Sequence, residues 1–322
     1  MRSFPLKIIW CLQDNFENRN GLISYLNMTI SDIKIRFQTE LTALYSRSEA
    51  DELFSIICEH FLGLNKAEAR MQPERDLSAD QYQQFLESIA ALKTGKPFQQ
   101  VLGGTEFFGM KFFVDEHVLI PRPETEELLE LAINKIQEKS TKNQVLDSAQ
   151  TDSAQTLKFK ILDIGTGSGI IPIVLKKHFP HAEIDAIDIS NEALKIARRN
   201  AEFHQAEINL IQKDYLNENL DNVYDIIISN PPYIGIEESI EIEESVKGFE
   251  PSMALFSPTT DALIFYRKIA KDSKNHLSEN GMVFLEINQK LGKETLELFR
   301  DFSESVLLKD ISGNDRMIFV QK

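Results

Sequence analysis

The stretch ILDIGTGSG, residues 161–169, decides the fold of this chain. Its apolar beginning predicts a buried strand, and its three glycines predict a sharp turn that leads into a helix. Glycine lets the backbone turn sharply and lets a ligand approach without a Cβ in the way. A dinucleotide-binding turn would carry its third glycine where Ile170 stands, so the spacing favours a ligand without a pyrophosphate. The alternative interpretation is a tight turn that binds nothing.

From Lys158 onward, beginning with this stretch, strand and helix patterns alternate. Helices are predicted between the early strands, for example over 191–203, and this alternation predicts a mainly parallel, doubly wound α/β sheet. The last two strands follow each other without a helix, so we expect them to form an antiparallel pair. The seven predicted strands are 160–164, 183–188, 209–212, 224–229, 282–287, 305–309 and 316–320.

The N-terminal part of the chain has a helical pattern. Apolar residues recur at helical spacing, with helix starts predicted at Ser48 and Ser78 and a stop at Gly63. Residues 28–97 are therefore predicted to form a small helical domain that recognises the substrate. Residues 1–27 show no clear period, and we interpret them as an extension that precedes a translation start at the following methionine.

The amino-acid composition changes after the helical domain. Residues 98–118 are rich in aromatic residues and glycine, which predicts a β-hairpin that links two domains. Pro123 suits the first turn of a helix that we expect to end near Lys139. The polar residues 140–156 predict a flexible insertion. The sheet domain would then occupy residues 119–322.

The composition of the chain disfavours several classes of function. The chain has 322 residues, and its formal net charge of −15 disfavours broad binding to nucleic acid, which needs clustered Lys and Arg. Cys11 and Cys58 have no metal-like spacing, and the six histidines show no zinc pattern, so no metal site is predicted. No stretch is long and apolar enough to span a membrane. A reducing cytoplasm suits this cysteine usage best.

Polar side chains follow the second and third predicted strands. Asp188 ends the second strand, where a carboxylate can accept hydrogen bonds from both hydroxyls of a ribose; capping the next helix is the alternative task. Asp214 and Tyr215 follow the third strand, where they suit the amine and the ring of an adenine. Because the carboxyl ends of parallel strands meet at one edge, these residues and the glycine turn predict a pocket for S-adenosylmethionine.

The fourth strand ends in Asn230-Pro231-Pro232-Tyr233. Two prolines end a strand, fix two φ angles and remove two N–H donors, so the turn presents oxygen acceptors. The side-chain oxygen of Asn230 also accepts, and Tyr233 can lie flat against a planar group. The turn therefore predicts a site for the –NH2 group of an amide or amine beside the cofactor. An ordinary strand-ending turn is the alternative.

Five motifs together carry a resemblance to a known family. Residues 29–322 resemble the HemK family of N5-glutamine methyltransferases, which modify peptide chain release factors. The motifs are IPRPETE (120–126), GTGSG (165–169), NPPY (230–233), FEP (249–251) and NDR (314–316). The resemblance implies a Rossmann-like, seven-stranded class I methyltransferase domain, preceded by a small N-terminal helical bundle and a β-hairpin. The chain departs from the family in its first 27 residues and in the polar insertion.

The resemblance also implies the site. S-adenosylmethionine would be the cofactor and S-adenosylhomocysteine the product. Cofactor contacts are implied for Gly165, Thr166, Gly167, Ser168, Gly169, Asp188, Tyr215 and Asn230. The substrate glutamine would be bound by Asn230, Pro231, Pro232 and Tyr233.

For catalysis, we expect the side-chain oxygen of Asn230 and the carbonyl of Pro231 to accept the two amide hydrogens, while Tyr233 packs on the amide plane. The family substrate lies in a Gly-Gly-Gln loop of the release factor. No metal, no stable nucleic acid complex and no membrane are implied, and we expect a monomer. Arg122 and Glu124 are expected to support the pocket.

Two alternatives stay open. The first is the related enzyme that methylates a glutamine of a ribosomal protein. The second is an amino-methyltransferase of adenine or cytosine in nucleic acid, which the net charge disfavours. The acidic run 237–244 has two interpretations, a contact with basic substrate residues and a solvated helix, and the solvated helix is favoured.

Overall fold

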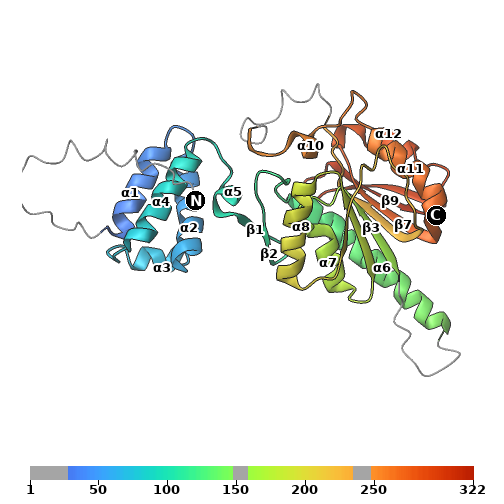
Figure 1. Cartoon of the computed structure of the whole chain (residues 1–322), viewed down its shortest axis with the longest axis horizontal. Coiled ribbons are helices and arrows are strands. Elements are labelled where there is room, and N and C mark those ends of the chain that lie inside the picture. The colour runs from blue at the N-terminus through green and yellow to red at the C-terminus, as the bar shows by residue number, and fades with distance from the viewer. Residues whose placement is uncertain (1–27, 148–158, 235–247) are drawn as a thin grey trace, which may run out of the picture. The chain divides into compact units, whose positions relative to one another are not determined.

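The computed structural model describes residues 28–147, 159–234 and 248–322 (Figure 1). The chain divides into two compact units, residues 1–89 and 90–322. The N-terminal extension, residues 148–156 of the predicted insertion and the acidic run 237–244 lie outside the described residues.

The first unit is helical, as the apolar spacing predicts. It contains α1 (Ile30–Leu41), α2 (Arg47–Leu62), α3 (Lys66–Met71) and most of α4 (Ala79–Leu92). Ser46 caps α2 through a capping box with Glu49, so the start predicted at Ser48 is wrong by two residues. The start at Ser78 and the stop at Gly63, which has a φ of 65°, are confirmed.

The second unit is built on one seven-stranded sheet. Its strands are β3 (Lys160–Ile164), β4 (Glu183–Asp188), β5 (Asn209–Gln212), β6 (Tyr224–Ser229), β7 (Leu277–Glu286), β8 (Glu304–Lys309) and β9 (Asp315–Gln321). Their order in the sheet is β5-β4-β3-β6-β7-β9-β8. Strands β3 to β7 run parallel, and β9 is antiparallel to both β7 and β8. The α/β sheet and the antiparallel final pair are therefore confirmed.

Strand β7 begins at Leu277, earlier than predicted. Leu277 pairs with Tyr224, and the register then shifts before Ile226 pairs with Met282. Between these pairs, Asn280 has a positive φ of 61°. This irregular stretch interrupts the alternation that identifies a strand from sequence, which explains the late predicted start.

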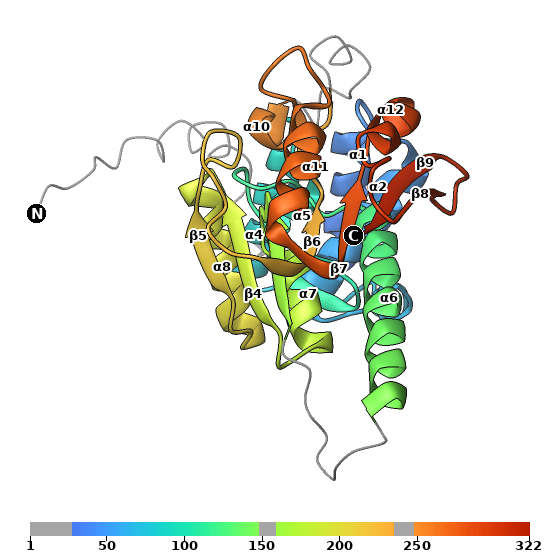
Figure 2. The same cartoon turned by 90° about the vertical axis from the view of Figure 1, so that its right-hand side faces the viewer.

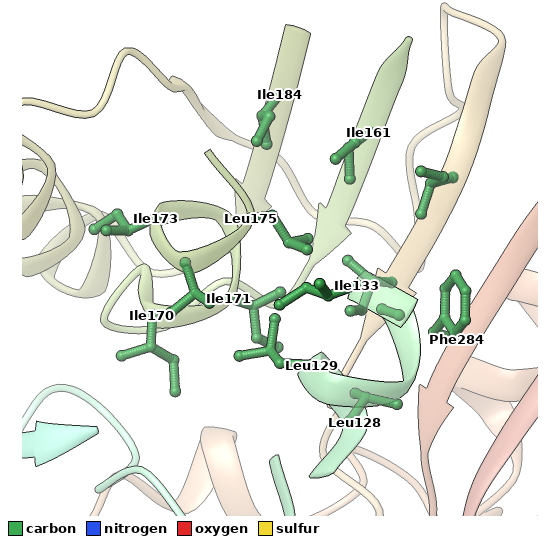
Figure 3. Packing of buried hydrophobic residues seen from close by; sticks show 14 of the residues in the cluster. Leu128, Leu129, Ile133, Ile161, Ile170, Ile171, Ile173, Leu175, Ile184 and Phe284 are labelled. Carbon is green, nitrogen blue, oxygen red and sulfur yellow. The ribbon is translucent and has the colours of Figure 1, made fainter. Parts of the chain in front are cut away.

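Helices pack on both faces of the sheet (Figures 1 and 2). The sheet helices are α6 (Pro123–Asp147), α7 (Ile170–His178), α8 (Asn191–His204), α11 (Ile264–His276) and α12 (Gly292–Glu297), and two short turns are α10 (Ser252–Leu255) and η2 (Gln289–Leu291). Alternate residues of β3 enter opposite cores: Ile161 belongs to the buried cluster that includes Leu128 of α6 (Figure 3). Leu162 belongs to the other cluster, which includes Ile269 of α11.

Helix α6 is longer than expected. It continues past Lys139 to Asp147, so residues 140–147 of the predicted flexible insertion are helical. That stretch contains neither proline nor glycine to stop a helix. None of the helices in the described ranges is both long and apolar enough to cross a membrane.

The predicted hairpin is shorter than residues 98–118. A short helix, α5 (Phe98–Leu102), comes first, and β1 (Gly104–Phe107) then pairs antiparallel with β2 (Met110–Phe113). Phe108 and Gly109, between the strands, both have positive φ, at 51° and 68°, as a two-residue hairpin turn requires. The hairpin belongs to the second unit.

Candidate active site

The glycine turn lies between β3 and α7 and has an open face. Gly165, Gly167 and Gly169 have φ values of 75°, 53° and 80°, which favour glycine. A Cβ added at Gly165 or Gly167 would meet nothing within 4 Å in the described residues. At Gly169 it would lie 3.1 Å from the Cβ of Ala197 in α8. The first two glycines therefore leave space for a ligand, and the third permits close helix packing.

Asp188, at the end of β4, holds this turn in place. Its Oδ2 accepts from the N–H of Gly167 at 2.9 Å, and its Oδ1 accepts from the N–H of Ser190 at 2.8 Å. The side chain of Ser190 caps α8 by accepting from Ala193 at 3.1 Å, so Asp188 is not the helix cap. Burial raises the pKa of Asp188, and the backbone N–H donors offset part of that rise. Each carboxylate oxygen keeps a lone pair for a ligand.

Asp163 lies fully buried near the same turn, and its position within β3 did not predict a role. Neither of its carboxylate oxygens accepts a hydrogen bond from the described residues, and the hydroxyl of Thr166 is also buried without such a bond. Burial raises the pKa of Asp163 to about 7, and the charge of Asp188 adds to the rise. The signal in the sequence was a carboxylate inside an otherwise apolar strand.

Asp214 and Tyr215 follow β5, beside the end of β4. Asp214 accepts from the side chain of Asn217 at 2.8 Å, and its own N–H donates to Glu218 at 2.8 Å. Tyr215 is only 5% exposed and packs in the core against α11, with Nζ of Lys268 4.9 Å from its ring centroid. Within the described ranges, the hydrogen bonds of the Asp214 side chain remain inside this turn.

Asn230 follows β6, which pairs with β3, so it lies next to the glycine turn along the edge of the sheet. Its Nδ2 donates to Oγ1 of Thr125, in the first turn of α6, at 3.1 Å. Its Oδ1 accepts no hydrogen bond from the residues that the structure describes. Pro231 is buried and has no N–H. The turn thus exposes an amide oxygen whose partner nitrogen is already occupied.

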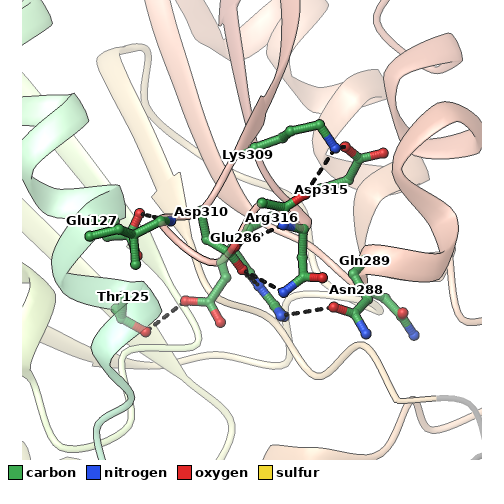
Figure 4. A network of polar contacts seen from close by, with 12 residues as sticks. Thr125, Glu127, Glu286, Asn288, Gln289, Lys309, Asp310, Asp315 and Arg316 are labelled. Atoms are coloured by element: carbon green, nitrogen blue, oxygen red, sulfur yellow. Dashed lines mark hydrogen bonds and ion pairs between the residues drawn. The ribbon is translucent and has the colours of Figure 1, made fainter.

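A buried carboxylate stands behind this turn. Glu286 ends β7, the strand next to β6, and is 1% exposed. Its Oε2 accepts from the Thr125 hydroxyl at 2.6 Å (Figure 4), and its Oε1 accepts from the Tyr233 hydroxyl at 3.3 Å. Burial raises the pKa of Glu286 to about 7, against the opposing effects of Thr125 and Arg316. Burial and the charge of Glu286 also raise the pKa of Tyr233.

The FEP motif is attached to the IPRPETE motif. Glu250 is 5% exposed; its Oε1 accepts from Arg122 at 2.6 Å, and its Oε2 accepts from the N–H of Ile120 at 2.9 Å. Gln100 of α5 donates to the carbonyl of Phe249 at 2.7 Å. The segment that leads into α6 is therefore fixed by an ion pair and a backbone hydrogen bond.

The NDR motif lies on the other side of Glu286. Arg316 donates to Asp310 at 3.2 Å and to Gln289 at 3.3 Å (Figure 4). Its positive charge lowers the pKa of Glu286, whereas the charge of Glu124 raises it. The charge of Glu124 therefore opposes the ionisation of Glu286, an effect that could not be predicted from the sequence.

Taken along the sheet, the carboxyl ends of five neighbouring strands carry the candidate site. From β5 to β7 they present Asp214, Asp188, the glycine turn, Asn230 and Glu286. An open glycine turn beside buried carboxylates fits a ligand with hydroxyls and a positive charge, and S-adenosylmethionine has both. The sequence missed Glu286 and Thr125 because their roles depend on contacts between distant segments.

The chain matches two family models and several known proteins. Residues 35–103 match the PrmC N-terminal domain, and residues 143–245 match the methyltransferase small domain. A release factor glutamine methyltransferase of Flavobacterium psychrophilum is 42% identical, over 91% of this chain and 99% of that protein. Another from Lactococcus lactis is 41% identical, over 77% of this chain and 86% of that protein. A solved methyltransferase from Pyrococcus furiosus is 16% identical with a TM-score of 0.42, covering 76% of this chain and 99% of that one.

Proposed function

The chain belongs to the family of release factor glutamine methyltransferases, and on that basis we propose that its Asn230–Tyr233 turn binds the glutamine to be methylated. The enzyme transfers a methyl group from S-adenosylmethionine to the side-chain amide nitrogen of a glutamine in a peptide chain release factor. The glutamine of a Gly-Gly-Gln loop suits this site, because its small neighbours let the side chain reach inward.

The observation that carries this proposal is the orientation of Asn230. Its Nδ2 is engaged by Thr125, so its Oδ1 is the end that is left to meet a substrate. The carbonyl of Pro231 supplies a second acceptor from a residue that has no N–H of its own. Two acceptors match the two hydrogens of a primary carboxamide.

The chemistry follows from this pairing. An amide nitrogen is a weak nucleophile, because its lone pair is delocalised into the carbonyl. Hydrogen bonds from both N–H groups to Asn230 and Pro231 fix the direction of attack and stabilise the positive charge that develops on nitrogen. Tyr233 packs against the amide plane. Bound S-adenosylmethionine supplies an activated methyl group, and the nitrogen loses its extra proton to solvent after the transfer.

The cofactor side of the site uses the other strand ends. Gly165, Thr166, Gly167, Ser168 and Gly169 would surround the cofactor with backbone, and Asp188 would accept from its ribose hydroxyls. Asp214 and Tyr215 would border the adenine, next to Asp188 along the sheet edge. The buried carboxylate of Asp163 would favour a positively charged cofactor near the turn.

Recognition of the release factor would involve more than the glutamine. We assign this task to the helical domain, residues 28–97, together with the hairpin linker, residues 98–118, which precede the catalytic domain, residues 119–322. The enzyme would act as a monomer in the cytoplasm. It would form no stable complex with nucleic acid, because a net charge of −15 opposes binding to phosphate.

Labelled S-adenosylmethionine tests the proposal. The protein is incubated with a release factor, the same factor with its loop glutamine changed to alanine, a ribosomal protein, or DNA. Label is expected on the intact factor alone. Label on DNA or on the ribosomal protein, with none on the factor, would overturn the substrate assignment. An Asn230→Ala variant that kept full turnover would overturn the site.

A further inference from the structure

Thr125 connects the substrate turn to a buried carboxylate. The residue is 2% exposed, and its hydroxyl lies between Nδ2 of Asn230, at 3.1 Å, and Oε2 of Glu286, at 2.6 Å. The hydroxyl of Tyr233 donates to the other oxygen of Glu286 at 3.3 Å. One carboxylate therefore holds both ends of the Asn230–Tyr233 turn, directly at the tyrosine and through Thr125 at the asparagine.

We infer that Glu286 is a positioning residue that acts through Thr125 to keep the side-chain oxygen of Asn230 turned toward the substrate amide. This inference rests on the proposed function, because it assigns a task to residues that do not touch the substrate themselves. In this arrangement, the buried negative charge of Glu286 determines which end of the Asn230 amide faces the substrate.

The direction of the hydrogen bonds supports this inference. A hydroxyl has one hydrogen, and the Thr125 hydrogen is used on Glu286, so its oxygen can only accept from its remaining neighbour. The two ends of an asparagine amide have nearly the same shape, and their hydrogen-bond partners decide which end lies where. An accepting Thr125 selects the NH2 end of Asn230, which leaves Oδ1 for the substrate.

Loss of the charge on Glu286 removes this selection. Once the carboxylate is protonated, it can donate to Thr125, whose own hydrogen is then free to bond Oδ1 of Asn230. The amide can then rotate and present N–H groups to a substrate that also offers N–H groups. A charged Glu286 additionally polarises the chain of hydrogen bonds and strengthens Oδ1 as an acceptor.

The groups that face Glu286 come from several elements. Arg316 of β9 favours its charged form, and Glu124 at the start of α6 opposes it. Thr125 and Tyr233 donate to its carboxylate, and Tyr266 of α11 donates to its main-chain carbonyl at 3.1 Å. Burial outweighs the favourable contacts and raises the pKa of Glu286 to about 7. Turnover by the correctly oriented site should therefore rise with pH through neutrality.

The test compares Thr125→Val, which keeps the shape and loses the hydroxyl, with Thr125→Ser, which keeps the hydroxyl. In the full-length protein with saturating release factor, Thr125→Val is expected to lower kcat about tenfold, and Thr125→Ser to recover most of it. Glu286→Gln should lower kcat by a similar factor and remove its rise between about pH 6 and 8. Affinity for S-adenosylmethionine, measured by calorimetry, should change less than about twofold in each variant.

Two results would overturn the inference. One is an equal kcat for Thr125→Val and Thr125→Ser. The other is a rise of kcat with pH that persists in Glu286→Gln. If Thr125→Val does not fold, the pH profile of Glu286→Gln decides alone. Failure of the proposed function is a separate outcome, because the unaltered protein would then put no label on the release factor at all.

Discussion

Asn200 joins the hairpin to the glycine turn through its side-chain amide and the carbonyl of Ser168. Its Nδ2 donates to that carbonyl at 2.8 Å and to the carbonyl of Phe113 at 3.0 Å, and its Oδ1 accepts from the N–H of Phe113 at 2.7 Å. The residue is fully buried in α8. A single amide therefore couples the segment that precedes the catalytic domain to the proposed cofactor turn.

Replacement of Asn200 by leucine should weaken cofactor binding. The change leaves the buried carbonyl of Ser168 and the N–H of Phe113 unpaired, which costs about 2–3 kcal/mol of stability and loosens the turn. The dissociation constant for S-adenosylmethionine is expected to rise about tenfold. Calorimetry measures the affinity, and urea unfolding measures the stability.

Arg199→Leu is the matched control for this prediction. The Arg199 guanidinium lies 3.6 Å from the ring centroid of Phe113, so its loss also weakens the attachment of the hairpin. Arg199 makes none of the contacts with Ser168 that Asn200 makes. The control should leave cofactor affinity unchanged, and equal losses of affinity in both variants would contradict the role assigned to Asn200.

Two alanine substitutions in the glycine turn should have different effects. At Gly169 the new Cβ would lie 3.1 Å from Ala197 at a positive φ, so Gly169→Ala should cost about 2–4 kcal/mol of stability. At Gly165 the new Cβ meets open space in the described structure, so strain alone costs about 1 kcal/mol. Gly165→Ala should instead lose affinity for S-adenosylmethionine. Melting temperatures measure the loss of stability, and calorimetry measures the loss of affinity. A larger loss of stability in Gly165→Ala than in Gly169→Ala, or a larger loss of affinity in Gly169→Ala, would refute the prediction.

Asp163 should make stability depend on pH. Burial raises its folded-state pKa from 3.8 to about 7, so its contribution is fully present below 3.8 and is lost as pH rises toward 7. Asp163→Asn has no titrating group at this position, so its free energy of unfolding does not fall in this way. Between pH 4 and 8, the free energy of unfolding of the variant should therefore rise by roughly 2–4 kcal/mol relative to that of the unaltered protein. Urea unfolding of both proteins without cofactor measures the difference. Because Glu286 titrates equally in both, its contribution cancels, and a constant difference at all pH values would count against this account.

The strands around the glycine turn could be predicted because each is a short apolar run with polar ends. The bounds of β3, β4, β5 and β6 are those that the sequence predicts. The start of β7 could not be predicted, because Asn280 takes a positive φ inside the strand. The helix α5 was hidden in an aromatic segment, where local pattern cannot distinguish a turn of helix from a strand.

In the candidate site, the positions along the sheet edge could be predicted from the sequence, but the contacts that connect them could not. Asn230 and Asp188 were recognisable as polar residues at strand ends. The partners Thr125 and Glu286 are separated by 161 positions, and nothing local in either segment indicates the bond between them. Asp188 also proved to hold the N–H of Gly167, a contact that depends on the two strands lying side by side.

The ion pair between Arg122 and Glu250 gives a final prediction, on the attachment of the motif that leads into α6. The carboxylate is almost completely buried, with a side-chain exposure of 1%, whereas the Arg122 side chain is 34% exposed. Arg122→Met should therefore leave an uncompensated buried charge and cost about 1–3 kcal/mol, less than a fully buried pair would. Since Glu250 also holds the N–H of Ile120, a shift of this segment would move Thr125 as well.

The double variant Arg122→Met with Glu250→Gln is the control. Glutamine retains an oxygen that can accept from the N–H of Ile120 and carries no charge, so the double variant should recover part of the stability that the single variant loses. Urea unfolding of both variants and of Glu250→Gln alone, with kcat measured in parallel, tests this. If the double variant is less stable than Arg122→Met by as much as Glu250→Gln costs alone, the two side chains are not coupled. The Arg122–Glu250 contact would then have no part in positioning Thr125.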